Sequence, residues 1–191
     1  MIVEVKLNVV ITGVGGQGLI TLANVIANAA LREGVNSIVA ETHGLSQRGG
    51  TVIVHVRLGD VEAPLIPKGE GDLMLSMELL EAARYLDFLS KDAEIVVNDY
   101  LLPPPLPGIE VPSRNFILNV LNRWKVFTVP ATSKALQLGD PRSANMVLLG
   151  KALKHTKLGE FISLNSVLET VRELWPKAYE INKRAIEVGM A

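Results

Sequence analysis

Short apolar runs alternate with segments of helical periodicity along most of the chain. The β-branched run at residues 7–12 predicts a buried strand, and residues 19–32, which place Leu22 and Ile26 at helical spacing before Gly34, predict a helix. Further strands are predicted at residues 37–40, 51–58, 72–77, 94–98 and 125–129, and a further helix at about 79–89. Strands separated by helices indicate a mainly parallel sheet covered on both faces.

Helical patterns dominate the end of the chain. Asp140 before Pro141 is typical of a helix start, and this helix is predicted to reach about residue 154. Ser166 and Glu169 fit a capping box for the next helix. We therefore expect an α/β fold: one Rossmann-like three-layer domain over residues 1–191, with a helical C-terminal extension at about 140–191. No helix is predicted between the strand at 51–58 and its predecessor, so an antiparallel strand or a hairpin insertion is expected there.

Composition narrows the function classes. Of the 191 residues, 48% are hydrophobic, which favours a full core, and the net charge of −1 argues against a general nucleic-acid or membrane-surface binder. There is no cysteine, so this chain cannot supply thiolate ligands to zinc or to an iron–sulfur cluster. Three scattered histidines provide no metal-ligand spacing, so no metal site is expected. The uncharged stretch at 7–31 is interrupted by a glycine cluster, and neither a membrane span nor a secretory signal is expected, which indicates a cytoplasmic location.

A glycine-rich loop follows the first predicted strand. Gly13, Gly15 and Gly18, with Gly16 and Gln17 between them, match G-x-G-x-x-G in the strand–loop–helix context that this motif requires. The first glycine permits a tight turn, the second permits close approach of a ligand, and the third permits close packing of helix and strand. The helix start would offer N–H groups to an anion.

Glu41 follows Gly18 by 23 residues, near the end of the second predicted strand. Dinucleotide-binding proteins place a ribose-binding carboxylate at about this spacing. The motif alone has two interpretations. The glycine loop and Glu41 form a nucleotide or anion site, or the glycines only permit a tight crossover from strand to helix.

The loop at 41–50 is unusually rich in reactive side chains for a connection between two strands. Arg48 is suited to clamping a carboxylate or phosphate, and His43 to transferring protons near neutral pH. A solvated loop, with glycines that satisfy its backbone geometry, explains the residues equally well.

Four segments together resemble a known family. GVGGQG, ETHGLSQRGGTVIVHVRLG, residues 64–86 and residues 138–153 are similar to the gamma-type domain of 2-oxoacid:ferredoxin oxidoreductases, and in particular to the small (beta) subunits of its indolepyruvate branch. The resemblance spans about residues 7–175. It implies oxidative decarboxylation of aryl 2-oxoacids such as indolepyruvate to aryl-acetyl-CoA, with ferredoxin as electron acceptor.

The resemblance also implies a division of labour in a hetero-oligomer. A large (alpha) subunit would carry thiamine diphosphate, magnesium and [4Fe-4S] clusters, while this chain would hold no cofactor alone and would be inactive in isolation. His43, Ser46, Gln47 and Arg48 become candidates for lining or closing the substrate end of the active site. The glycine loop either binds nothing or contacts an anionic part of coenzyme A.

Two other functions remain open from the residues. A nicotinamide-dependent enzyme that acts alone would use the glycine loop, with Glu41 favouring NAD over NADP. A non-catalytic scaffold subunit would bind a partner, and changes at His43 or Arg48 would then leave the kinetics unaltered.

Overall fold

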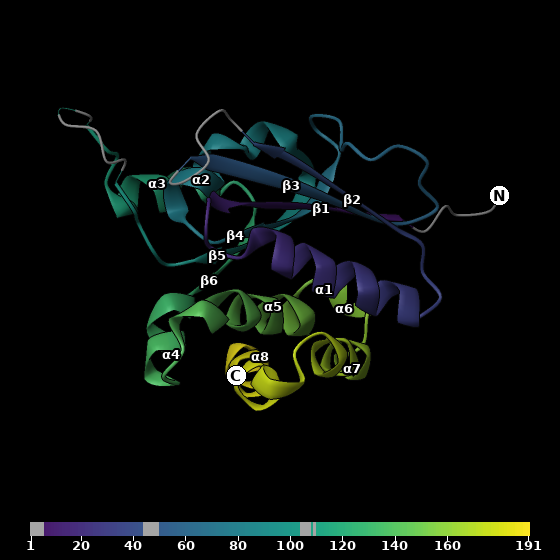
Figure 1. Cartoon of the computed structure of the whole chain (residues 1–191). Coiled ribbons are helices and arrows are strands. Elements are labelled where there is room, and N and C mark those ends of the chain that lie inside the picture. Colours follow the sequence, from purple (N-terminus) through teal and green to yellow (C-terminus); the bar gives the residue numbers. More distant parts are fainter. Residues whose placement is uncertain (1–5, 44–49, 104–107, 109) are drawn as a thin grey trace.

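The computed structural model describes residues 6–43, 50–103, 108 and 110–191, and is built around a six-stranded sheet of order β2-β3-β1-β4-β5-β6 (Figure 1). The pairs β1–β4, β4–β5 and β5–β6 are parallel, whereas β3 is antiparallel to both β1 and β2. The mainly parallel sheet and the antiparallel insertion are both confirmed. The strands are β1 (Lys6–Val14), β2 (Ser37–His43), β3 (Thr51–Gly59), β4 (Gly71–Ser76), β5 (Leu89–Asn98) and β6 (Lys125–Val129).

Helices cover both faces of this sheet. On one face lie α1 (Leu19–Arg32) and α5 (Ala144–His155), and on the other lie α2 (Leu79–Arg84) and α3 (Arg114–Leu121) (Figure 1). The side chains alternate accordingly: Leu73 and Leu75 join the α1/α5 cluster, while Met74 between them joins the α2/α3 cluster. The strands are therefore buried on both faces, as a parallel sheet requires.

The C-terminal helices form an outer layer over α5 (Figure 1). This layer contains α7 (Leu164–Leu174) and α8 (Tyr179–Met190), and α4 (Ala131–Gln137) and α6 (Leu158–Phe161) complete the helical side. One hydrophobic cluster combines Val96 of the sheet with Ile186 of α8, which supports the proposal that residues 1–191 form one domain. No helix in the described part of the chain has both the length and the apolar character to cross a bilayer.

Several predicted boundaries differ from the structure. The helix expected at about 79–89 ends at Arg84, and a 3-10 turn at Leu86–Phe88 leads directly into β5. The helix predicted to start at Pro141 begins instead with another 3-10 turn, Pro141–Ser143, before α5 begins. The loop expected at 41–50 begins later, because β2 continues to His43 and pairs there with Val52.

The predicted capping box at Ser166 is wrong. The N-cap of α7 is Ser163, whose Oγ accepts a hydrogen bond from the Ser166 N–H at 3.1 Å. Ser166 itself donates its hydroxyl to the Ser163 carbonyl at 2.9 Å. The helix therefore begins three residues earlier than Ser166 suggests, because the preceding serine already has the extended backbone that an N-cap needs.

Two glycines bring the backbones of α5 and α8 into direct contact. A Cβ atom at Gly150 would lie 2.0 Å from the carbonyl oxygen of Ile186, and one at Gly189 would lie 2.0 Å from that of Val147. Neither contact leaves space for a methyl group. These glycines therefore determine how closely the outer layer approaches α5.

We expect Gly150→Ala to lower the free energy of unfolding by about 1–3 kcal/mol, because the added methyl group must push α8 away from α5. Urea unfolding followed by circular dichroism measures this change. Lys154→Ala, at an exposed position of the same helix, serves as the control. Equal stability of Gly150→Ala and the control would contradict the close approach of the two helices.

Candidate functional site

The carboxyl ends of β1, β4, β5 and β6 meet at one edge of the sheet. From β1 the chain crosses to β2 on one side, and from β4 it continues to β5 on the other side, so the crevice between β1 and β4 is a topological switch point. Open α/β sheets bind ligands at such points. Two buried hydroxyl groups join the strands there, because Thr12 Oγ1 lies 2.8 Å from Ser76 Oγ.

The glycine loop is folded tightly against this crevice. A Cβ at Gly13 would lie 3.2 Å from Met77 Cβ, so the first glycine permits the close approach of β1 and the segment after β4. Gln17 closes the turn with two hydrogen bonds to Val14. Its side-chain Oε1 accepts from the Val14 N–H at 2.7 Å, and its backbone N–H donates to the Val14 carbonyl at 3.1 Å. Gly16 and Gly18 have φ values of +97° and +75°, which side-chain-bearing residues rarely adopt.

The second glycine of the motif has a different role from the expected one. The Gly15 N–H donates to the Gly50 carbonyl at 3.0 Å, which extends the contact between the ends of β1 and β3. This amide is therefore bonded within the protein and is not directed at a ligand. The contact also holds the described end of the polar loop, at Gly50, beside the glycine loop.

The side chains of the four residues predicted at the substrate end, His43, Ser46, Gln47 and Arg48, lie outside the described part of the structure. The backbone of His43 ends β2 opposite Val52, on the same edge of the sheet as the glycine loop. Their assignment to the substrate end stays a prediction.

Glu41 lies at a distance from the glycine loop. It pairs with Val54 inside the β2–β3 ladder, two residues before β2 ends. The strand β3 separates β2 from β1, and strands in a sheet are about 4.7–4.9 Å apart, so Glu41 is about two strand spacings from the strand that bears the loop. In the dinucleotide arrangement the two strands are neighbours.

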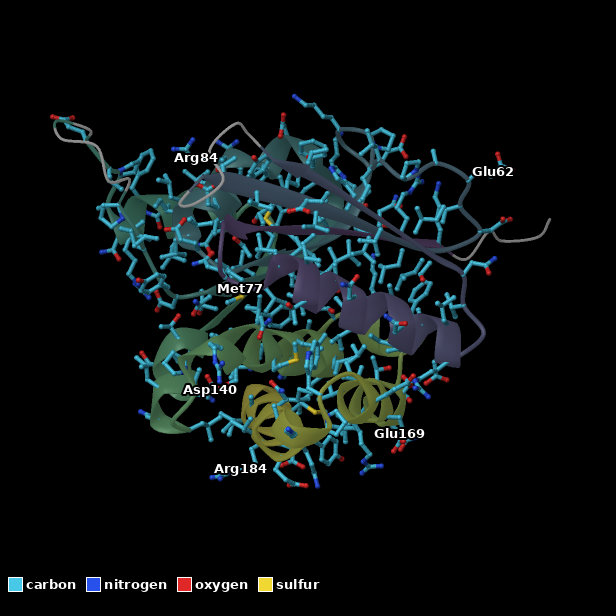
Figure 2. All side chains as sticks on the ribbon, viewed as in Figure 1. Glu62, Met77, Arg84, Asp140, Glu169 and Arg184 are labelled. Carbon is cyan, nitrogen blue, oxygen red and sulfur yellow. The ribbon has the colours of Figure 1, made fainter. Side chains whose placement is uncertain are left out.

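A pocket of about 550 Å³ opens between the glycine loop and the C-terminal helices. Figure 2 shows two of its lining residues, Met77 beneath the sheet and Asp140 in the turn before α5. The lining residues are Gly16, Gln17, Gly18, Thr21, Met77, Tyr100, Thr132, Asp140, Pro141, Arg142, Ser143, Ala144, Asn145, Met146, Trp175, Ala178 and Asn182. The pocket is thus built from the glycine loop, the ends of β4 and β5 and the C-terminal helical region, which lie far apart in the sequence.

The starts of two long helices border this pocket. α1 has 14 residues, and no side chain caps its first amide groups. α5 instead continues the 3-10 turn Pro141–Ser143, in which Asp140 Oδ1 accepts from the Arg142 N–H at 3.1 Å and the Ser143 and Ala144 N–H groups donate to backbone carbonyls. Uncapped helix starts present N–H groups and the positive end of the helix dipole. The nearby charges of Asp140 and Arg142 compensate each other, because the guanidinium donates to both carboxylate oxygens at 2.9 and 3.0 Å. The start of α1 is therefore the part of the pocket border suited to an anion.

Asn145 lines this pocket, and the sequence analysis did not place it among the candidate site residues. Its side chain is buried and donates from Nδ2 to the Gly18 carbonyl at 3.1 Å. The helical pattern alone marks it only as one polar position among apolar ones. The available signal was its place within residues 138–153, a segment that carries the family resemblance.

Two buried ionisable groups near the sheet have structural roles. Burial raises the pKa of Glu78, whose carboxylate nevertheless accepts from the Glu81 N–H at 2.7 Å and from the Leu102 N–H at 2.9 Å. It therefore caps α2, as its position predicts. Burial, assisted by the Arg57 guanidinium, lowers the pKa of His55, whose Nδ1 lies 3.3 Å from the Ile66 nitrogen.

His155 ends α5 and is not protonated as readily as its position suggests. A position at a helix C-terminus favours protonated histidine, but burial and the charges of Lys151, Lys154 and Lys125 lower the pKa of His155. Its ring lies against Phe127, with centroids 5.6 Å apart. Among the described residues, no three histidine or carboxylate side chains are grouped so as to hold a metal ion.

Comparisons with known proteins identify the family and the fold. The family model for pyruvate ferredoxin/flavodoxin oxidoreductase matches residues 8–191. Indolepyruvate oxidoreductase subunit IorB of Archaeoglobus fulgidus is 38% identical over 190 residues, covering 96% of this chain and 94% of that protein.

Solved structures share the fold at lower identity. Pyruvate oxidoreductase subunit PORC from Thermotoga maritima has a TM-score of 0.73 at 21% identity, covering 96% of this chain and 94% of that one. The 2-oxoglutarate:ferredoxin oxidoreductase from Magnetococcus marinus, solved with 2-oxoglutarate, coenzyme A and succinyl-CoA bound, has a TM-score of 0.73 at 22% identity. The match covers 97% of this chain and 30% of that chain.

We expect the free energy of unfolding to decrease as the pH falls below 6.5, the ordinary pKa of histidine, because the unfolded chain binds a proton there that buried His55 does not. The contribution of His55 is complete above that pH and is lost as the pH falls toward its lowered pKa. His55→Asn keeps an acceptor for the Ile66 N–H but does not titrate. Its stability should therefore depend less on pH than that of the wild type.

Urea unfolding at a series of pH values between about 7.5 and 5.5 measures the two dependences. His155 also has a lowered pKa, so the difference between the wild type and His55→Asn isolates the contribution of His55. Identical slopes would show that His55 titrates normally in the folded protein.

Proposed function

The chain belongs to the pyruvate ferredoxin/flavodoxin oxidoreductase family, and we propose that it is the small subunit of an enzyme that oxidises indolepyruvate or a related aryl 2-oxoacid. The observation that carries this proposal is the 38% identity to an IorB subunit over 94% of the length of that subunit. More distant relatives named for 2-oxoglutarate and pyruvate oxidoreductases are 26% identical. The identities therefore favour the indolepyruvate branch.

A separate large subunit would hold the redox cofactors. Thiamine diphosphate with magnesium would supply the electron sink for decarboxylation, and [4Fe-4S] clusters would carry electrons to ferredoxin. The absence of cysteine from the sequence means that cluster ligands must come from another chain. A hetero-oligomer in the cytoplasm, with an inactive isolated small subunit, stays our prediction.

This chain's own contribution would be to bind an anionic part of coenzyme A. The pocket of about 550 Å³ lies within the range of about 300–1,000 Å³ that is usual for small-molecule sites. The uncapped start of α1 borders it, and phosphate groups bind at such helix starts through backbone N–H groups. Trp175 also lines the pocket and offers an aromatic surface to a nucleotide base.

The polar loop would act at the substrate end. His43, Ser46, Gln47 and Arg48 are the proposed residues, with Arg48 countering the negative charge of the oxoacid or of coenzyme A. The bond between Gly15 and Gly50 supports this proposal, because it joins the described end of this loop to the glycine loop.

A nicotinamide-dependent enzyme is disfavoured by two features of the site. The Gly15 amide is already bonded to Gly50, and β3 separates the strand of Glu41 from β1. Both features differ from the dinucleotide arrangement that the glycine motif alone suggests.

We expect the chain, assembled with its large partner, to support reduction of ferredoxin that requires both an aryl 2-oxoacid and coenzyme A. The value of kcat/KM should be higher for indolepyruvate than for pyruvate or 2-oxoglutarate. The isolated chain and the isolated partner serve as controls, and both should be inactive. Full activity of the partner alone would contradict the proposal, as would oxidation of the substrate by NAD without ferredoxin.

Arg48→Ala in the assembled enzyme should lower kcat/KM by roughly ten- to a hundredfold, because a charge-assisted hydrogen bond to the substrate or to coenzyme A is lost. Steady-state kinetics with each substrate varied in turn show which ligand is affected. Arg184→Ala, at an exposed position of α8, is the matched control. Unaltered kinetics with intact assembly would favour a scaffold role for the loop.

A further inference from the structure

The side-chain amide of Asn145 has a fixed orientation in the pocket. Its nitrogen, Nδ2, lies 3.1 Å from the Gly18 carbonyl oxygen. A carbonyl oxygen only accepts hydrogen bonds, so the nitrogen end of the amide faces Gly18 and the oxygen end, Oδ1, points away from it. A Cβ at Gly18 would lie 2.6 Å from Nδ2, so the amide fits there because Gly18 has no side chain. The fold therefore sets the position of Oδ1 before any ligand binds.

Asn145 Oδ1 is an acceptor without a partner at a buried residue. Asn145 is 4% exposed, and it lines the pocket of about 550 Å³. Within the described residues, the amide of Asn145 makes the bond to Gly18, and no donor reaches Oδ1. The side-chain atom in this part of the chain that is sealed from solvent and unpartnered is His155 Nε2, so Oδ1 is open to the pocket. Buried acceptors are normally hydrogen-bonded, and Oδ1 is thus suited to a donor on a ligand.

The rest of the lining favours a flat, uncharged group. The lining contains one acidic and one basic residue, Asp140 and Arg142, which neutralise each other through bonds of 2.9 and 3.0 Å. Trp175 is half-buried, and its ring contacts no other ring or cation among the described residues. Met77 adds a further apolar surface. An unstacked aromatic ring and an unpartnered acceptor in one pocket fit a planar ring that carries an N–H donor.

We propose that Asn145 Oδ1 accepts a hydrogen bond from the 6-amino group of an adenine ring packed against Trp175. The proposal rests on the proposed function, in which this adenine belongs to coenzyme A. Adenine presents an amino donor at its 6-position, whereas guanine and hypoxanthine present a carbonyl oxygen there. Two acceptors that face each other in a buried site both stay unpaired, so Asn145 selects adenine over a 6-oxo base.

Steady-state kinetics of the assembled enzyme compare coenzyme A with an analogue in which oxygen replaces the 6-amino group. In the wild type, the KM for the analogue should be about ten- to a hundredfold higher, because Oδ1 loses its donor and meets an acceptor. In Asn145→Leu, which has a similar size and no polar side-chain atom, the ratio of the two KM values should fall to about one. A merely structural role would raise both values and preserve the ratio.

Two further variants complete the kinetic test. Asn28→Leu, at an exposed position of α1, is the matched control and should keep the wild-type ratio. If Asn145→Leu does not assemble, Asn145→Ala, which also lacks the acceptor, replaces it. The value of kcat at saturating coenzyme A should change little in each variant, because the lost bond acts in binding.

Tryptophan fluorescence provides a readout that does not depend on turnover. Adenosine 3′,5′-bisphosphate, added to the assembled enzyme without substrates, should quench the emission of Trp175, because the base packs on its ring. The quenching should be absent in Trp175→Phe. It should persist in the control Trp124→Phe, since Trp124 does not line the pocket and donates its indole N–H to the Ser90 carbonyl at 2.8 Å. Inosine 3′,5′-bisphosphate should quench only at a higher concentration.

The outcomes separate this inference from the proposed function. Equal KM values for coenzyme A and the analogue in an active wild-type enzyme would overturn the recognition of adenine and leave the proposed function intact. The same conclusion would follow if the ratio persists in Asn145→Leu, or if that variant raises only the KM for indolepyruvate. Oxidation of the 2-oxoacid that does not require coenzyme A would instead overturn the proposed function, and the placement of adenine with it.

Discussion

The junction between the carboxyl ends of β1 and β4 is the constraint on which the rest of the molecule depends. Gly13 has no side chain, so Met77 packs directly against the backbone of β1, and the buried pair of Thr12 and Ser76 joins the strands just before it. This close approach positions the glycine loop at the switch point of the sheet. The start of α1 then faces the space where the other parallel strands end.

The C-terminal helices complete the site that this junction begins. Gly150 and Gly189 allow α8 to lie against the backbone of α5, and the same segment of chain brings Trp175 and Asn182 to the pocket. The close packing of α5 and α8 and the shape of the pocket therefore depend on the same segment of chain. Within the described residues, the pocket has one wall from the glycine loop and another from the last third of the chain.

The sequence predicts the elements better than the contacts between them. The helix at 19–32 and the strand at 125–129 are found with these bounds, because uninterrupted periodicity and β-branched residues determine them locally. Helices α3 and α4 were missed, since they are short and follow proline-rich or strand segments. The bonds from Gly15 to Gly50 and from Asn145 to Gly18 join distant residues, and no local pattern encodes such contacts.

We propose that this chain is one subunit of an oxidoreductase whose redox centres lie in a separate, larger subunit. Mild affinity purification from native lysate, with mass spectrometry and a visible absorption spectrum of the eluate, tests it most directly. We predict a stoichiometric, larger, cysteine-rich partner and the broad absorbance of iron–sulfur clusters. A colourless chain that is repeatedly recovered alone and binds NAD would contradict the account.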